Sequence, residues 1–255
     1  MKILLLLTIL FCTACARENL NDNGPYEDVS TKVEVPCPNQ TGQTMVLYAF
    51  GQSNSANSLE KVYTNSDARI INYFKGRCYI ASDPLLGASG GRGSQWVVSA
   101  QKLMATGSFD AIIINSFGVG GSGIGDWISK PDYVRRYKNP DLSVYTPTHF
   151  LWHQGESDAA HGTSTSNYQS WMSQIINDSI QNFPTAKFYV SLATICGGNA
   201  PYEPVRQAQK NVVDNTRVFQ GPDTDTISDR YDGCHIGASG QEEISNFWAS
   251  VLNLN

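Results

Sequence analysis

The first candidate for chemistry is Ser53, which lies in the stretch Tyr48 to Ser58 (YAFGQSNSANS). An apolar run, Met45 to Phe50, ends abruptly at Gly51 and is followed by small polar residues that could begin a helix. A strand, a glycine turn and a serine at a helix start expose the hydroxyl group at the carboxyl end of a sheet. The sequence therefore predicts a nucleophile here, although a serine after a strand is more often only a helix cap.

A partner for such a serine lies near the carboxyl end of the chain, in Tyr231 to Gly240 (YDGCHIGASG). Asp232 and His235 are three residues apart, and on a turn this spacing puts both side chains on one face. The carboxylate can then hold one ring nitrogen, which leaves the other nitrogen to take a proton from a nucleophile. The alternative is a capping aspartate beside an incidental histidine.

Another polar group follows an apolar stretch, in Trp152 to Asp158 (WHQGESD). Gln154 could donate a side-chain N–H to a developing oxyanion. Glu156 could contact substrate or make an internal hydrogen bond, and the sequence leaves both alternatives open. We interpret His153 as a hydrogen-bonded structural group and not as a base.

Two glycine-rich segments differ in their interpretation. Gly118 to Trp127 (GVGGSGIGDW) is not a phosphate loop, because no Gly-Lys-Ser/Thr follows it. It is either a flexible turn or a backbone that approaches a ligand closely and donates an N–H group. We interpret Gly87 to Ser94 as the entry to a helix.

Strands and helices alternate along the chain. Apolar runs predict five strands, at Thr44 to Phe50, Ala68 to Phe74, Asp110 to Asn115, Thr148 to Trp152 and Lys187 to Ala193, with a short extended piece at Arg217 to Gln220. Helical spacing predicts four helices, at Ser94 to Ala105, Ser166 to Asn182, Pro201 to Asp214 and Ser239 to Leu252. This alternation indicates a mostly parallel sheet that is covered on both faces. Ligands of such sheets bind beyond the carboxyl ends of the strands, where the polar segments lie.

Composition excludes several classes of protein. The 255 residues fit one α/β domain, and the 41% hydrophobic content suffices for a core. A formal net charge of −5 argues against nucleic acid as a partner, because that binding needs a basic face. No apolar run is long enough to form a membrane-spanning helix.

The amino terminus has the pattern of an export signal. One lysine precedes the apolar stretch Ile3 to Phe11, and small residues precede Cys15. We expect residues 1–15 to be a signal peptide, residues 16–40 a tether and extension, and residues 41–255 the folded domain. The residues before Cys15 resemble a bacterial lipoprotein signal, so a lipid on Cys15 is the one membrane attachment that we expect. The alternative is ordinary cleavage and a free protein, which is periplasmic or secreted.

The four motifs together resemble the SGNH (GDSL-like) hydrolase superfamily. The order GQSN, GGSGI-x-x-W, WHQGES and D-x-x-H is similar to its branch of sialate O-acetylesterases and acetylxylan esterases. The resemblance implies a flavodoxin-like, three-layer α/β/α sandwich with a five-stranded parallel sheet. It also implies Ser53 as nucleophile, His235 as base and Asp232 as orienting residue. The implied oxyanion donors are the backbone N–H groups of Ser53 and Gly121 and the side chain of Gln154.

We therefore expect an exported serine esterase that removes O-acetyl groups from carbohydrates through an acyl-enzyme, with no metal and no cofactor. The residues expected to contact the acetylated carbohydrate are Gln52, Asn54, Glu156 and Trp127. Two alternatives remain: a non-catalytic carbohydrate-binding lipoprotein on the same fold, and a general short-chain esterase or lipase.

Four cysteines follow the leader, and an even number in an oxidising compartment indicates disulfides. Cys196 lies at the end of the fifth predicted strand, just beyond Ala193, and Cys234 lies in the loop that carries Asp232 and His235. That loop must reach the same end of the sheet if a triad forms, so we expect a Cys196–Cys234 bridge. Elimination then leaves Cys37 with Cys78. The alternative is four free, buried thiols.

Overall fold

The computed structural model describes residues 24–138 and 144–254. The predicted signal peptide, Cys15 and the first part of the tether lie outside the described residues. Among those that are described, no helix has both the length and the apolar character needed to cross a membrane.

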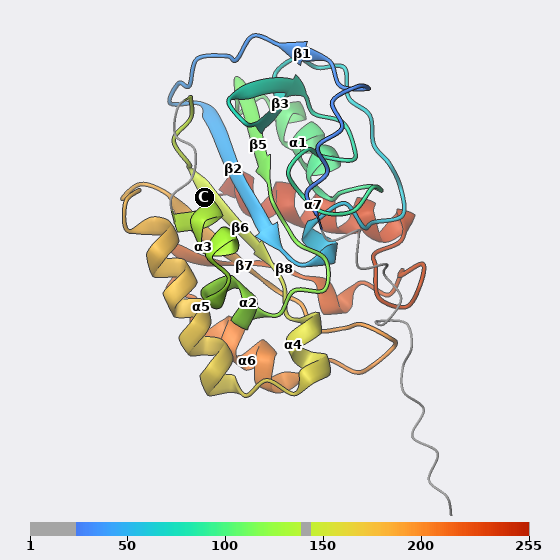
Figure 1. Ribbon diagram of the computed structural model, residues 1–255, viewed down its shortest axis with the longest axis vertical. Coiled ribbons are helices and arrows are strands. Elements are labelled where there is room, and N and C mark those ends of the chain that lie inside the picture. The colour runs from blue at the N-terminus through green and yellow to red at the C-terminus, as the bar shows by residue number, and fades with distance from the viewer. Residues whose placement is uncertain (1–23, 139–143, 255) are drawn as a thin grey trace, which may run out of the picture.

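One mixed sheet forms the centre of the molecule (Figure 1). Its strand order is β1-β4-β3-β5-β2-β6-β7-β8. The bounds are Glu34–Val35 for β1, Thr44–Gly51 for β2, Ile70–Phe74 for β3, Arg77–Ile80 for β4, Ala111–Ser116 for β5, His149–His153 for β6, Lys187–Leu192 for β7 and Val218–Asp223 for β8. The neighbours from β3 to β8 pair in parallel, whereas β4 and β1 extend the β3 edge in antiparallel fashion.

The fold class is as predicted, but the predicted five-stranded sheet is too small. The piece after Arg217 is a full parallel strand, β8. The antiparallel strand β4 follows β3 after a two-residue turn, at Lys75 and Gly76, both with positive φ. Such a turn matches the twist of a hairpin, and the short strand beyond it has too few residues to show a pattern in the sequence.

Strand β2 shows why the fold has three layers, with a core on each face of the sheet. Val46, Tyr48 and Phe50 pack into the core on one face. Met45, Leu47 and Ala49 pack into the core on the other face. Successive side chains of a strand point to opposite faces, so a strand that is buried on both faces must be apolar throughout.

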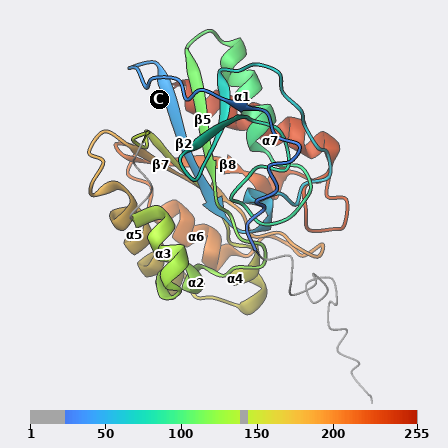
Figure 2. The same cartoon turned by 45° about the horizontal axis from the view of Figure 1, so that its top comes forward.

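Helices cover both faces (Figures 1 and 2). Helices α1 (Trp96–Ala105) and α7 (Ala238–Leu254) cover one face. The other face is covered by α2 (Ile124–Ser129), α3 (Pro131–Lys138), α5 (Thr165–Ile180) and α6 (Glu203–Asn211). The four predicted helices correspond to α1, α5, α6 and α7, and the short helices α2, α3 and α4 (Glu156–His161) were not predicted.

Residues 24–40 form part of the folded domain, although the sequence placed its start at residue 41. Strand β1 pairs with β4, and Cys37 is joined to Cys78 by a disulfide. Lys32 donates hydrogen bonds of 2.7 Å to the carbonyl groups of Ser82 and Pro84. The extension is therefore fixed to the edge of the sheet by backbone, covalent and side-chain contacts.

Candidate active site

Ser53 lies in a tight turn at the carboxyl end of β2. Gly51 has a φ of 132°, and a Cβ at this position would overlap the carbonyl group of His153 on β6. The turn therefore requires glycine, as the sequence indicated. Ser53 begins the 3₁₀ helix Ser53–Ser55, and neither its hydroxyl nor its backbone N–H makes a hydrogen bond within the described chain. Both groups are thus available to a ligand.

Asp232 and His235 form the predicted pair. Asp232 Oδ2 lies 2.6 Å from His235 Nδ1, and Oδ1 accepts the backbone N–H groups of Cys234 at 2.9 Å and His235 at 2.7 Å. Burial would raise the pKa of the Asp232 carboxyl, but the hydrogen bonds and the imidazole outweigh it and lower that pKa. The carboxylate stays ionised, so it can orient the ring and stabilise an imidazolium.

Asn54 joins the Ser53 turn to the loop of His235. Its Nδ2 lies 3.4 Å from the carbonyl oxygen of Cys234, and its Oδ1 accepts the N–H of Ile236 at 3.1 Å. These two backbone groups flank His235 in the chain. Asn54 therefore holds the loop of the expected base, His235 (the base loop), beside the turn of the expected nucleophile, Ser53.

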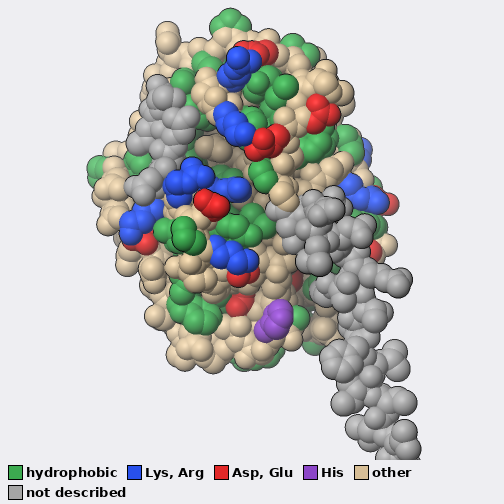
Figure 3. Space-filling model, viewed as in Figure 1, with side chains coloured by type: hydrophobic (Ala, Val, Ile, Leu, Met, Phe, Trp, Pro, Cys, Tyr) green, Lys and Arg blue, Asp and Glu red, His purple; other side chains and the backbone are tan. Residues whose placement is uncertain are grey.

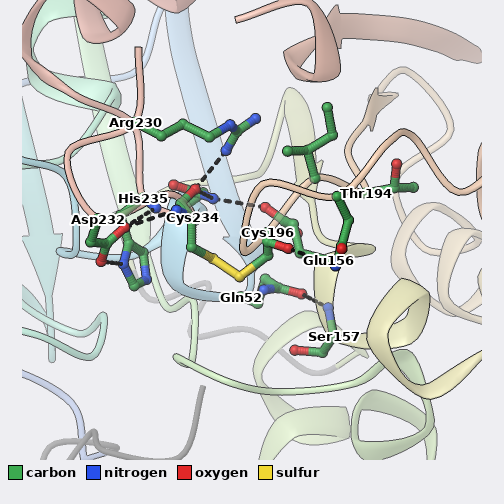
Figure 4. Close-up of a disulfide and its surroundings, with 12 residues drawn as sticks. Gln52, Glu156, Ser157, Thr194, Cys196, Arg230, Asp232, Cys234 and His235 are labelled. Atoms are coloured by element: carbon green, nitrogen blue, oxygen red, sulfur yellow. Dashed lines mark hydrogen bonds and ion pairs between the residues drawn. A yellow bond between two sulfur atoms is a disulfide. The ribbon is translucent and has the colours of Figure 1, made fainter. Parts of the chain in front are cut away.

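The same loop is held by the disulfide between Cys196 and Cys234 (Figure 4). Gly197 N donates to the Gly233 carbonyl at 2.9 Å, and Arg230 donates to the Cys234 carbonyl at 2.6 Å. Both predicted bridges, this one and Cys37–Cys78, are present. The topological argument for Cys196 and Cys234 is confirmed.

The glycine segment also lies against the Ser53 turn. Val119 N donates to the Gly51 carbonyl at 2.9 Å, and Gly120 N donates to Ser89 Oγ at 2.7 Å. Gly121 has a φ of 69°, lies exposed, and makes no backbone hydrogen bond through its N–H within the described residues. Of the two adjacent glycines, Gly121 is thus the one with a free donor.

Gln154 does not have the geometry expected of an oxyanion donor. Its side chain is fully buried, and its Nε2 lies within 3.2 Å of three acceptors: Gln52 Oε1, the Ser122 carbonyl and Asp158 Oδ2. An amide nitrogen carries two hydrogens, so internal partners occupy both. Gln154 instead fixes the neighbouring Gln52.

The side-chain amide of Gln52 has a donor that finds no partner within the described chain. Its Oε1 accepts the Gln154 amide at 3.2 Å and the backbone N–H of Ser157 at 3.0 Å, as Figure 4 shows for Ser157. Its Nε2 donates to none of the residues that the structure describes, although the side chain is only 3% exposed. Because Gln154 Nε2 contacts both Gln52 Oε1 and the Ser122 carbonyl, the Gln52 amide lies near the segment that contains Gly121. A nearly buried donor without a partner calls for an explanation, and a bound oxyanion supplies one.

Glu156 makes internal hydrogen bonds, which is one of the two alternatives that the sequence left open. Its Oε1 accepts Asn54 Nδ2 at 2.8 Å and lies 3.4 Å from His153 Nε2. Gln95 Nε2 lies 2.9 Å from His153 Nδ1 and 2.7 Å from the Asn54 carbonyl, while Gln95 Oε1 accepts the indole N–H of Trp248. With both Gln95 hydrogens donated, His153 Nδ1 must accept, so the ring proton lies on Nε2 and faces Glu156. His153 is therefore structural, as expected.

Three of the four residues expected to contact substrate are interior. Asn54 and Trp127 are fully buried and Glu156 is 2% exposed. The Trp127 indole N–H donates to Ser122 Oγ at 2.9 Å. Asn54 and Glu156 are bonded to each other, and Asn54 also contacts the His235 loop, so these side chains and Trp127 have internal partners where substrate contacts were expected. Gln52 is the fourth expected contact, and its side-chain amide keeps a donor without a partner within the described chain.

A sequence model of one family, described as a carbohydrate esterase and sialic acid-specific acetylesterase, matches residues 43–253. The chain belongs to this family. It is a carbohydrate O-acetylesterase, and the predicted resemblance to the sialate O-acetylesterase branch is confirmed. A comparison with curated proteins gives no match.

Several solved structures share the fold of this acetylesterase. A protein from Arabidopsis thaliana is 19% identical with a TM-score of 0.69, and the match covers 84% of this chain and 98% of that chain. A carbohydrate acetylesterase from Xanthomonas citri is 17% identical with a TM-score of 0.55, covering 80% of this chain and 54% of that one. A family 3 carbohydrate esterase from Clostridium thermocellum is 14% identical with a TM-score of 0.52, covering 83% and 96%. At these identities the likeness shows the fold alone.

The bridge beside the base should matter for both stability and activity of the acetylesterase. Its sequence separation is 38 residues, so replacing Cys196 and Cys234 together by serine should cost about 3–4 kcal/mol of unfolding free energy. It should also lower kcat about tenfold or more, because a shift of the base loop by an ångström is costly. Urea unfolding and steady-state kinetics measure the two effects.

The second bridge is a matched control. The separation of Cys37 and Cys78 is 41 residues, and the bridge joins the chain just after β1 to β4 at the sheet edge. Replacing that pair by serine should cost a similar unfolding free energy and leave kcat nearly unchanged. Equal losses of kcat in the two double variants would show that the bridge at Cys234 does not position the base.

Glu156 should give the acetylesterase a pH-dependent stability. Burial raises the pKa of its carboxyl, but hydrogen bonds from His153 and Asn54 outweigh it and lower that pKa from its usual 4.5 to about 2. A lowered pKa stabilises the fold above pH 4.5, and this contribution is lost as the pH falls through 2. Between these values wild type should lose on the order of 3 kcal/mol more unfolding free energy than Glu156→Gln.

Urea unfolding at several pH values checks this expectation. Glu243→Gln is the matched control, because Glu243 is an exposed residue of α7. It should follow the wild-type curve. If Glu156→Gln also runs parallel to wild type from pH 7 down to 2, Glu156 does not carry the buried charge.

Proposed function

We propose that this acetylesterase works through an acyl-enzyme on Ser53. Ser53 Oγ attacks the acetyl carbonyl carbon while His235 Nε2 takes the hydroxyl proton. His235 then gives that proton to the sugar oxygen as the C–O bond to the acetyl group breaks. Water attacks the acetyl-serine by the same route, which releases acetate and restores Ser53. No metal or organic cofactor takes part in this sequence.

The observation that carries the proposal is the junction made by Asn54. It joins the Ser53 turn to the backbone on both sides of His235, whose ring is already bound to Asp232. No Ser53–His235 hydrogen bond is needed before substrate binds, because such bonds often tighten only in the complex. A protein that only bound sugar would gain nothing from orienting the imidazole of His235 and holding its loop at the Ser53 turn, where the hydroxyl has no hydrogen-bond partner within the described chain.

Three donors would stabilise the oxyanion. They are the backbone N–H groups of Ser53 and Gly121, which have no partner within the described chain, and the Nε2 of Gln52. Gln154 takes the role of positioning Gln52. Donors held in place before the reaction stabilise the developing charge with little reorganisation.

The substrate proposed is an O-acetylated carbohydrate, in agreement with the family, and the protein would meet it outside the cytoplasm. Two disulfides support an oxidising compartment. Export would depend on the leader, residues 1–15, and a lipid on Cys15 would anchor the protein to a membrane.

Acetate release from a panel of acetylated glycans tests the proposal. Acetylated sialic acids, acetylated xylan and p-nitrophenyl esters from acetate to octanoate would be compared. We expect acetyl esters to be cleaved fastest and at least one glycan to exceed p-nitrophenyl acetate in kcat/KM. Preference for octanoate would indicate a lipase, and no turnover of any ester would indicate a binding protein.

A further inference from the structure

A second feature adjoins the active site and takes no part in the proposed chemistry. It is a hollow of about 290 Å³, close to the smaller volumes of small-molecule sites. Its lining residues are Asn57, Ser58, Ser89, Gly90, Gly91, Arg92 and Tyr231. Most of them belong to the glycine-rich segment that the sequence suggested only as a helix entry.

The hollow lies between the base loop and the oxyanion loop. The Tyr231 ring on one side stacks against the His235 ring, with centroids 6.0 Å apart. Ser89, on another side, accepts the N–H of Gly120, which directly precedes Gly121. A substrate whose ester lies at Ser53 could therefore place a second group in this hollow.

Several groups that line the hollow are donors without a partner within the described chain, and one of them is a cation. The Arg92 guanidinium lies 5.2 Å from the centroid of the Tyr231 ring and forms no ion pair with any described residue. The N–H groups of Gly90 and Gly91 and the hydroxyl of Ser58 also make no hydrogen bond within the described chain. A cation with several unpaired donors around a hollow favours an anion.

The local backbone keeps these donors in place. Arg92 N donates to the Asn57 carbonyl and Gly93 N to the Leu59 carbonyl, each within 3.0 Å. Gly90 has a φ of 85°, and a Cβ there would lie 2.5 Å from the Asn57 carbonyl oxygen. The segment from Gly90 to Gly93 thus packs closely against Asn57 and Leu59, which follow the Ser53 turn.

No described carboxylate lies within ion-pair distance of Arg92. The acid of the adjoining loop, Asp232, already accepts two backbone N–H groups and the imidazole of His235. A second group of basic side chains lies around α3, on the face seen in Figure 3. Unlike Arg92, two of its members form ion pairs. There Lys75 pairs with Glu27 at 2.7 Å, and Arg135 lies 4.0 Å from Asp132.

We infer that this hollow binds a carboxylate on the sugar that carries the acetyl ester. A planar guanidinium matches the two oxygens of a carboxylate, which a hydroxyl group of a neutral sugar cannot imitate. The inference deepens the proposed function and rests on it for the placement of the ester at Ser53. The acid is that of a sialic acid or a uronic acid residue, which share this chemistry.

The test compares each free acid with its methyl ester, which removes the charge and keeps the ring. Wild-type kcat and KM would be measured on an O-acetylated sialic acid, an O-acetylated glucuronoside and their methyl esters. We expect a lower KM for the free acid, a preference that weakens at high salt. The pair of substrates with the larger preference identifies the source of the carboxylate.

Arg92→Ala should lower the preference for acid over ester roughly 10- to 100-fold, mostly through KM, and Arg92→Lys should restore part of it. Arg135→Ala is the matched control and should keep the preference. Equal treatment of acid and ester by wild type would overturn the inference. So would an equal loss on both substrates in Arg92→Ala, because that is the result of disturbing Tyr231 and His235 alone.

Calorimetry separates this inference from the proposed function. Binding of free sialic acid, glucuronic acid and their methyl esters to wild type and Arg92→Ala needs no turnover. Acid-selective binding that disappears in Arg92→Ala would support the subsite even in a protein that cleaves no ester. Binding that is the same for acid and ester would contradict the subsite, whatever the esterase activity.

Discussion

Replacing Ser53 with alanine is expected to lower kcat about 10³-fold or more while the protein stays folded. In the proposed mechanism this hydroxyl forms the acyl-enzyme, and without it the remaining donors can only stabilise an oxyanion made by water. Because Ser53 makes no side-chain hydrogen bond within the described chain, its loss should leave the unfolding free energy nearly unchanged.

Acetate release and urea unfolding measure these two quantities. Ser129→Ala is the matched control, because Ser129 is exposed at the end of α2 and its Oγ donates only to the Gly125 carbonyl. It should keep wild-type kcat. Retention of more than about a tenth of the activity in Ser53→Ala would exclude Ser53 as the nucleophile.

Gln52→Glu is expected to lower kcat about 10²- to 10³-fold, as for the loss of one oxyanion donor. A glutamate keeps an oxygen that can accept from Gln154 and Ser157, and it replaces the Nε2 donor by a second oxygen. That oxygen would repel the developing charge. The loss should appear in kcat, because the ground-state carbonyl gains little from this donor.

Two further variants make the test specific. Gln52→Ala removes the donor without adding charge, so its kcat should lie between those of wild type and Gln52→Glu. Gln101→Glu, on α1, is the surface control. A Gln52→Glu enzyme that changes only in KM would make Gln52 a substrate contact, and the oxyanion hole would then lack its proposed side-chain donor.

The sequence was most informative where the local pattern and the chemistry coincide. Long apolar runs predicted the central strands because both faces of the sheet are buried. Asp232 and His235 could be predicted because three residues of a turn are enough to form the pair. The Cys196–Cys234 bridge could be predicted because a base loop that serves Ser53 must reach the carboxyl end of the sheet.

The sequence did not show which of the polar and aromatic side chains near the site are buried. Trp127 and Glu156 have side chains typical of a sugar site, yet both lie in the interior. The junction made by Asn54 depends on the positions of segments more than 100 residues apart, for which a sequence gives no distance. Gln154 and Gln52 are both amides near the nucleophile, and only their hydrogen-bond partners separate the positioning role from the donor role. Arg92 lies in a segment whose glycines suggested only a turn.

Labelling with a p-nitrophenyl alkylphosphonate tests the central claim most directly, because such an ester phosphonylates an activated serine. One equivalent of p-nitrophenol should be released as acetylesterase activity disappears, and mass spectrometry should find the phosphonyl group on Ser53. His235→Ala should react far more slowly at the same residue, because the hydroxyl proton then has no base. Labelling at another residue, or full activity in a protein whose Ser53 is modified, would contradict the account.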